Sequence, residues 1–226
     1  MNGFDFENDI VPLFIVFFSM LLALFVPLYF TFKKEIKRRR EIEAYCKKNG
    51  FDYFKEAKDI PSSVYSFQLM QRAYGQKIDE IKGNRDGYDF YIFENLQGSG
   101  QHRQSETFCL FTNKNMNLPQ FYLREKNTIT DSIGKVFGME DIEFKETGFS
   151  TKFLLQGKSE ESIREFFNEN VRKVFIKFFV RNDQYEGQQN YFLLSVPGRL
   201  ELNDKINLMY RAANILNNIF PKNPQD

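Results

Sequence analysis

The chain has a single histidine, and this residue is the first candidate for chemistry. His102 lies in the polar segment 97–106. A zinc site needs several imidazole or thiolate ligands that converge, and the two cysteines, Cys46 and Cys109, are far from each other in sequence. A catalytic triad would need a nucleophile and an orienting acid around the histidine. We interpret His102 as a solvated loop residue and predict no metal centre.

Two short motifs resemble catalytic or phosphate-binding signatures but lack the required context. Gly98-Ser99-Gly100 is followed by strand-like sequence, whereas a phosphate-binding loop opens a helix. Ser132-Ile133-Gly134-Lys135 matches the S-x-x-K motif of penicillin-binding enzymes, but the sequence contains neither the S-D-N nor the K-T-G partner motif. We interpret the first motif as a hairpin loop and the second as a chance match.

A group of carboxylates is the remaining candidate for catalysis or cation binding. Four acidic residues surround two apolar ones, in the order Glu140, Asp141, Ile142, Glu143, Phe144 and Glu146. The alternation of apolar and acidic residues favours a strand with an exposed acidic face. We therefore predict no catalytic residue and no cofactor, and an enzyme that uses only carboxylates remains the third functional alternative.

The overall charge of the chain gives no general reason to expect nucleic-acid binding. Among 226 residues, 31 Lys and Arg oppose 30 Asp and Glu, which leaves a net charge of +1. The length fits one domain, or one domain with an appendage. The two cysteines are predicted to be unpaired thiols, as is usual in a reducing compartment.

Residues 10–32 form a hydrophobic segment of 23 residues without a charge, IVPLFIVFFSMLLALFVPLYFTF. A helix of this length spans about 34 Å, which exceeds a bilayer core of about 30 Å. A cleaved signal peptide would need a basic start, a shorter apolar core and a small-residue cleavage site, whereas residues 1–9 are acidic. A buried core helix rarely has so long an uncharged run. The segment is predicted to be an uncleaved transmembrane helix.

The flanks of this segment predict the orientation of the chain. Residues 1–9 contain no Lys or Arg, and six basic residues follow the segment: Lys33, Lys34, Lys37, Arg38, Arg39 and Arg40. The positive-inside rule places this side in the cytoplasm of a single-pass cell-membrane protein, with the N-terminus outside. The six residues either bind anionic lipid headgroups or only set the topology. Segment 33–49 has no Pro or Gly and is predicted to extend the helix as a basic stalk that ends at Gly50.

The rest of the chain is predicted to form one cytosolic α+β domain over residues 50–220, with 221–226 as a disordered tail. Mainly antiparallel strands and hairpins are expected, with helices packed on one side. A stripe with helical spacing predicts the last helix: Leu202, Ile206, Met209, Ala213, Leu216 and Phe220. The expected strands are 50–54, 77–82 and 88–96 around a turn at 83–87, 107–112, 118–124 at a sheet edge, 149–156, and a hairpin of Tyr185 with 190–196. The other expected helices are 64–74, 131–137 and one that begins at Ser159, while 171–179 fits either a helix or a strand.

Residues 33–220 resemble a family of uncharacterised bacterial proteins that have one N-terminal membrane helix and a small cytosolic domain. The segments behind the resemblance are RRREIEAYCKKNGFDY, LPQFYLREK and GMEDIEFKETGFSTKFLLQGKSEESIREFF. The resemblance implies a single-pass topology and a single α+β domain, and it implies no known activity.

Two functions from different classes follow from these expectations. The first is a membrane-anchored, non-enzymatic interaction module whose partners are the lipid bilayer and a protein. The alternative is a domain at the inner membrane face that binds a lipid or another hydrophobic ligand in an apolar cavity. A large dry cavity lined by Phe would favour the ligand, and an exposed apolar patch would favour the protein partner.

Overall fold

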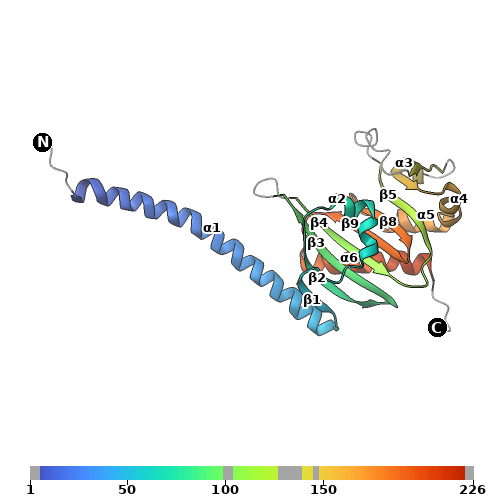
Figure 1. Ribbon diagram of the computed structural model, residues 1–226, viewed down its shortest axis with the longest axis horizontal. Helices are drawn as coiled ribbons and strands as arrows, with labels where there is room; N and C mark the ends of the chain where they lie inside the picture. The colour runs from blue at the N-terminus through green and yellow to red at the C-terminus, as the bar shows by residue number, and fades with distance from the viewer. Residues whose placement is uncertain (1–5, 99–103, 127–138, 145–147, 222–226) are drawn as a thin grey trace. The chain divides into compact units, whose positions relative to one another are not determined.

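The computed structural model describes residues 6–98, 104–126, 139–144 and 148–221, with side chains from Phe14 onward. The chain divides into two compact units, one that ends at Ala44 and one that begins at Tyr45. Figure 1 shows the long N-terminal helix and the sheet with its packed helices.

The first unit consists of most of helix α1, Phe6–Asn49, which is 44 residues long. The helix continues through Pro27, and the side chains from Phe14 to Phe32 are exposed. By length and composition α1 is a candidate membrane span, and none of its apolar window is buried. The helix ends at Gly50, whose φ of +72° is left-handed, and the Phe51 N–H donates to the Cys46 carbonyl at 2.9 Å. This is the Schellman stop expected of a glycine that follows a helix.

Within the described residues, the second unit contains one nine-stranded sheet in which every pairing is antiparallel. The strand order is β1-β2-β3-β4-β9-β8-β5-β7-β6. The predicted α+β fold with a mainly antiparallel sheet is confirmed. The strands are β1 Asp52–Glu56, β2 Gln76–Arg85, β3 Tyr88–Gln97, β4 Gln104–Thr112, β5 Leu118–Glu125, β6 Glu140–Asp141, β7 Phe153–Gly157, β8 Gln184–Gln189 and β9 Tyr191–Pro197.

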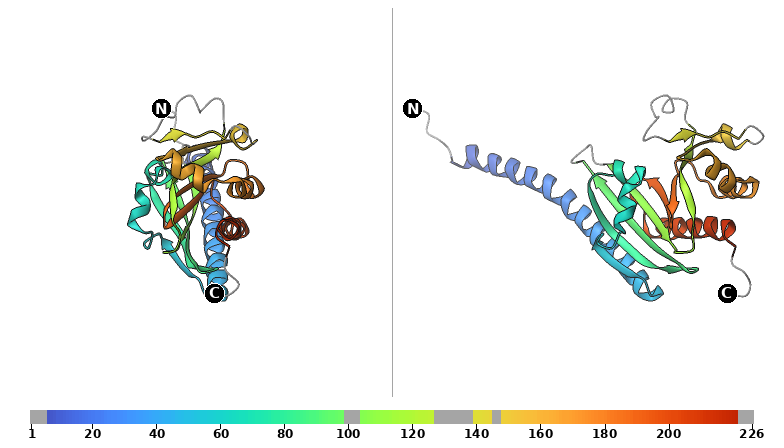
Figure 2. Two further views of the ribbon diagram at one scale, coloured as in Figure 1. Left: turned by 90° about the vertical axis from the view of Figure 1, so that its right-hand side faces the viewer. Right: turned by 45° about the vertical axis from the view of Figure 1, so that its right-hand side comes forward.

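Helices cover both faces of the sheet, so the prediction that they pack on one side is wrong (Figure 2). On one face, Phe67 and Met70 pack against Tyr91, Leu110 and Leu193. On the other face, α6 contacts β3 and β4, and rings of α4 and α5 pack on Phe121. The short elements of the first face are η1 Ser62–Ser66 and α2 Gln68–Arg72; the remaining helices are α3 Phe149–Lys152, α4 Glu160–Phe166, α5 Glu169–Phe178 and α6 Leu202–Ile219.

Both hairpins form, but each turn is tighter than predicted. The β2–β3 turn is the pair Asp86-Gly87, with φ angles of 52° and 77°, which suits a type I′ turn. Gly83, expected in this turn, lies inside β2 because a Cβ there would overlap the ring of Phe51. Gly187 lies inside β8 for the same reason, since a Cβ would overlap the ring of Phe121. These glycines are required by side-chain packing and not by a turn.

Strand β5 is not the predicted edge strand. It lies between β8 and β7, and the edges of the sheet are β1 and β6. Pro119 lies at an irregularity in the β5–β8 register between Leu118 and Phe121, and pairing with β7 begins only at Phe121. The missing N–H of the proline therefore removes no ladder bond, and an interior strand tolerates it.

The predicted helix over 64–74 is interrupted. Phe67 is extended, with φ −68° and ψ 142°, and separates η1 from α2. Its side chain is buried in the core, and η1 begins after Pro61 without a side-chain cap. Tertiary packing of Phe67 outweighs the local helix preference here.

The other predicted elements have mixed outcomes. Ser159 caps α4 and accepts a hydrogen bond from the Ser162 N–H, as predicted, and 171–179 is largely helical. The strand predicted over 149–156 begins only at Phe153, after the single turn α3. Helix α6 forms as predicted, with Leu208, Ala212 and Ile215 buried in addition to the central residues of the stripe. The helix predicted over 131–137 lies outside the described residues.

Candidate functional site

The basic collar consists of the six residues that follow the apolar part of α1: Lys33, Lys34, Lys37, Arg38, Arg39 and Arg40. Lys33, Lys34, Lys37 and Arg40 are exposed. The Lys37 ammonium lies 3.8 Å from Glu41, so only weak pairing offsets its charge. The exposed part of the collar can therefore present positive charge to an anionic surface.

Arg38 and Arg39 differ from the other collar residues. The Arg38 Nη1 atom lies 3.9 Å from the Glu35 carboxylate, one turn earlier in the same helix. Arg39 donates from Nε to Glu35 at 2.9 Å and is half-buried. The sequence shows six equivalent charges, but within the helix Glu35 offsets part of the charge of these two arginines.

A buried ionic cluster joins β2 and β3 to the start of α6. Asp79, Glu94 and Lys205 have fully buried side chains. Lys205 Nζ lies 2.8 Å from Glu94, and Arg199 bonds both Glu94 and Asp79, the latter at 2.7 Å. Tyr53 donates its hydroxyl proton to Asp79 at 2.7 Å. The charges in this cluster compensate one another, which indicates a structural role.

Sequence reasoning missed this cluster, although one signal for it exists. Ile78 and Ile81 are buried but lie three positions apart, which breaks the two-residue period of a strand. The break is a bulge in β2, where Asp79 has a φ of +52° and turns its carboxylate inward.

A second polar group lies on the face that α2 covers. Both oxygens of the buried Glu186 carboxyl accept backbone N–H groups, from Gln68 at 2.8 Å and Leu69 at 3.0 Å. Burial raises the pKa of Glu186 to about 7, against the lowering effect of these N–H groups and of Arg72. Burial also raises the pKa of Glu106, which accepts a hydrogen bond from the Ser195 hydroxyl. A raised pKa can mark a catalytic acid, but the partners of Glu186 make it the anchor of α2.

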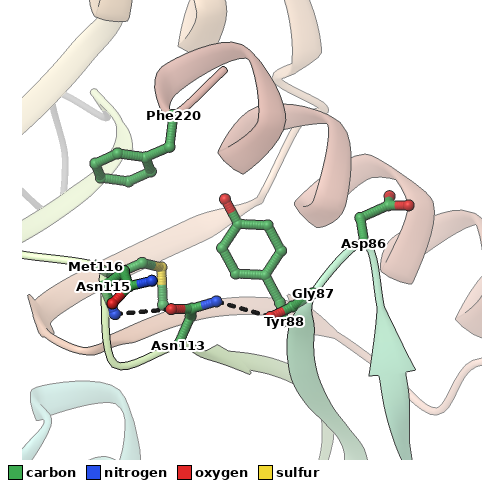
Figure 3. A pocket seen from close by; sticks show the side chains of 7 residues that line it. All are labelled: Asp86, Gly87, Tyr88, Asn113, Asn115, Met116 and Phe220. Carbon is green, nitrogen blue, oxygen red and sulfur yellow. Dashed lines mark hydrogen bonds between the residues drawn. The ribbon is translucent and has the colours of Figure 1, made fainter. Parts of the chain in front are cut away.

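Two open pockets meet at the C-terminal end of α6, and Phe220 lines both. The first, about 270 Å³, is bounded by the β2–β3 turn and the β4–β5 loop (Figure 3). The second, about 470 Å³, is a groove between the start of β5 and helices α4, α5 and α6. The groove alone has the size of a small-molecule site. No pattern in the sequence pointed to either pocket.

Of the histidine, the S-x-x-K motif and the cysteines considered for chemistry in the sequence, only the two cysteines lie among the described residues. His102 and the segment 132–135 lie outside the described residues. In the described part of the chain, no group of three His, Cys, Asp or Glu side chains is arranged to hold a metal ion. Cys46 and Cys109 are free and buried, and burial raises the pKa of both thiols, that of Cys46 to about 11.

The first two of the predicted acidic residues, Glu140 and Asp141, lie at an edge of the sheet. Glu140 and Asp141 form the exposed edge strand β6, followed by the buried Ile142. Asp141 accepts a hydrogen bond from the Gln156 amide at 2.8 Å. Glu146 lies outside the described residues. The predicted strand with exposed acidic side chains is present, but it is only two residues long.

Comparison with known proteins finds one with a similar fold and none with a similar sequence. No family of known proteins matches the sequence, and no curated protein matches it. The crystal structure of the mycobacterial trehalose monomycolate transport factor A, TtfA, superposes with a TM-score of 0.56. The two chains share a fold. The match covers 83% of this chain and 98% of the TtfA chain, at 15% sequence identity. At this identity the similarity to TtfA shows the fold alone.

Proposed function

We propose that this protein is a membrane-anchored, non-enzymatic module that holds its α+β domain at the cytoplasmic face for contact with a protein partner. The main support is helix α1, in which an uncharged apolar segment with exposed side chains continues without a break into the basic collar. The absence of Lys and Arg before the segment supports the cytoplasmic orientation.

The basic collar binds anionic lipid headgroups in this proposal. Its first residue, Lys33, follows directly on the last apolar residue, Phe32, where headgroups lie when the apolar segment spans the hydrocarbon core. Each Lys or Arg near an anionic surface contributes about 1 kcal/mol. Lys33, Lys34, Lys37 and Arg40 are the accessible members.

A non-enzymatic role is supported by what the buried charged groups do. Glu186 holds α2, and the ionic cluster around Glu94 holds the start of α6. The name of TtfA assigns that protein to trehalose monomycolate transport. By analogy of fold alone, we propose that this chain is also an accessory factor in a process at the membrane and not a catalyst.

The ligand-binding alternative is supported by the pockets and not by the interior of the fold. Phe121 contacts the rings of Phe166, Phe167 and Phe175 at centroid distances of 5.0–6.2 Å, so aromatic side chains fill the space under α4 and α5. The two pockets at Phe220, in contrast, are open to a ligand.

Anchoring is tested by alkaline carbonate extraction of membranes that contain the full chain. The chain should remain in the membrane pellet after extraction. Release into the supernatant would overturn the anchor and the function based on it.

Headgroup binding is tested by purifying the full chain in mild detergent from vesicles of mixed phosphatidylcholine and phosphatidylglycerol. The co-purified lipid should be enriched in phosphatidylglycerol. Replacement of Lys33, Lys34, Lys37 and Arg40 by Gln should abolish most of this enrichment. Gln at Lys47 and Lys48, exposed residues of the last turn of the same helix, is the matched control and should leave it unchanged. Equal enrichment in all three proteins would mean that the collar only sets the topology.

A further inference from the structure

The second half of α5 and the turn that follows it present basic and apolar side chains to the outside. Residues 170–182 contain four Lys and Arg and no Asp or Glu. Lys173, Ile176 and Lys177 are exposed, and their spacing of three and four positions places them on one side of the helix. Val171 and Phe175 are buried on the opposite side. The core therefore uses one side of α5, and the exposed side is left without a partner from the described residues.

The apolar part of this exposed side consists of two aliphatic residues, Ile176 and Val180, which are 41% and 49% exposed. Among the described residues of the second unit, no other large aliphatic side chain is exposed. A tight turn holds Val180 in place, because its N–H donates to the Asp183 carboxylate at 3.0 Å and its carbonyl accepts the Asp183 N–H at 3.1 Å. The fold thus fixes two neighbouring aliphatic groups in contact with water.

The basic part surrounds these two residues. Lys152, Lys177 and Arg181 are exposed, and no ion pair joins them to another residue of the part that the structure describes. The Lys152 ammonium lies 4.8 Å from the centre of the Phe179 ring, which directly precedes Val180. Only Lys173, 2.6 Å from Glu169, has its charge offset. The surface therefore has three uncompensated positive charges around an aliphatic pair.

This composition favours an anionic lipid surface over a protein partner. Lysine is depleted at protein–protein interfaces, whereas lysine beside exposed apolar residues is typical of helices that lie on a membrane. Two aliphatic side chains are also too little apolar area for the centre of a stable protein interface. They are enough to enter the headgroup layer while the neighbouring cations contact lipid phosphates.

A membrane anchor allows such a small surface to be effective. A domain that is tethered to the bilayer meets the lipid surface at a high effective concentration, so its docking needs little intrinsic affinity. A free domain with the same surface would bind vesicles only weakly.

We propose that the α5 patch, defined as Lys152, Ile176, Lys177, Val180 and Arg181, docks reversibly on the anionic leaflet of the membrane that holds α1. This inference rests on the proposed membrane anchor and adds a lipid contact separate from the basic collar. Release of the chain by carbonate would overturn the anchor. Retention in the membrane without the docking measured below would overturn the patch alone.

The test uses the absence of tryptophan from the chain, because Ile176→Trp then reports on the α5 patch alone. The full chain is reconstituted in vesicles of phosphatidylcholine, with or without phosphatidylglycerol, and brominated acyl chains in the phosphatidylcholine quench any tryptophan that enters the bilayer. We expect quenching about threefold stronger with phosphatidylglycerol than without it, and loss of this difference at high salt. Tyr74→Trp, at an exposed position after α2, is the matched reporter and should be quenched weakly in both vesicles.

Charge variants in the Ile176→Trp background test the electrostatic part. Replacement of the three unpaired cations of the patch by Gln should remove most of the phosphatidylglycerol-dependent quenching: Lys152→Gln, Lys177→Gln and Arg181→Gln. The matched control removes the same charge from exposed positions elsewhere in the second unit and should leave the quenching unchanged: Lys55→Gln, Lys58→Gln and Lys114→Gln. The basic collar is the same in all of these proteins and cannot account for a difference between them.

Three results would overturn the proposal. They are equal quenching of the two reporters, equal quenching of Ile176→Trp with and without phosphatidylglycerol, and equal effects of the two triple variants. A blue shift of the Ile176→Trp emission without bromolipid quenching would also overturn it, because a second copy of the chain would then cover the patch.

A second measurement applies if Ile176→Trp does not fold. A nitroxide is attached to Ile176→Cys, since both native cysteines are buried. Its accessibility to lipid-soluble oxygen should be higher in vesicles that contain phosphatidylglycerol than in phosphatidylcholine alone. Equal accessibility in the two kinds of vesicle would overturn the proposal.

Discussion

At the scale of single residues, the second unit buries several ionisable groups whose titration is coupled to folding. Burial raises the pKa of Glu80, Glu106, Asp183 and Glu186. Glu186 has the clearest consequence, because both of its carboxyl oxygens hold the start of α2. Its ionisation must therefore change the stability of the folded state.

For Glu186 we predict stability that falls as the pH rises. The unfolded chain releases this proton near pH 4.5, whereas the folded chain releases it near pH 7. The stabilisation is therefore complete below about pH 4.5, is lost as the pH rises through 7, and amounts to about 3 kcal/mol at most. Glu186→Gln cannot ionise, so its free energy of unfolding should decrease less between pH 5 and pH 8 than that of the unmodified chain.

The measurement for Glu186 is urea denaturation of the full chain in mild detergent, followed by circular dichroism at pH 5 and pH 8. Glu56→Gln, an exposed position at the end of β1, is the control and should follow the unmodified chain. Parallel pH profiles for Glu186→Gln and the unmodified chain would contradict the prediction.

At the scale of elements, helix α6 joins the sheet core to the pockets. Its buried face includes Met209, Ala213 and Leu216, while Lys205 ties its first turn to Glu94. Its far end places Phe220 in both pockets. The helix therefore positions the candidate ligand site and also completes the core.

For α6 we predict that Leu216→Ala destabilises the folded state by about 2–5 kcal/mol, because it removes a fully buried side chain and leaves a cavity. Asn214→Ala, an exposed position on the same helix, should stay within about 0.5 kcal/mol of the unmodified chain. Thermal melting of the full chain in mild detergent compares the two. Equal melting temperatures would show that α6 is not part of the core.

At the scale of the whole molecule, the orientation that we propose rests on the charge difference across the apolar segment. The segment is preceded by no Lys or Arg and followed within eight residues by six. Cys109 is unsuitable as a topology reporter, since it is fully buried and its raised pKa disfavours the reactive thiolate. A cysteine that reports the topology must instead be introduced at an exposed position, such as Lys158.

We predict that Lys158→Cys is protected from a membrane-impermeant maleimide in intact cells and is labelled in inverted vesicles. Replacement of all six collar residues by Gln, with Lys added ahead of Ile10, should produce a measurable inverted population. The unmodified collar in the Lys158→Cys background is the control. Labelling of Lys158→Cys in intact cells at the rate seen after lysis would overturn the cytoplasmic orientation.

The sequence by itself determined the features that depend on neighbouring residues. The apolar run and the basic collar predicted α1, Gly50 predicted its end, and the helical stripe from Leu202 predicted α6. These predictions succeed because a helix and its cap are specified within a few residues by periodicity and backbone freedom. The charges of the collar were visible in the same way.

Only the tertiary structure decided the features that depend on residues far apart in sequence. It placed β5 inside the sheet, interrupted the helix at Phe67, and put Gly83 and Gly187 under aromatic rings. Glu186 accepts a hydrogen bond from Gln68, 118 positions away in the chain, and Tyr88 and Phe220 line one pocket although they are far apart in sequence. Burial raises a pKa, and a pocket forms, only when several elements exclude water together. No local pattern encodes that exclusion.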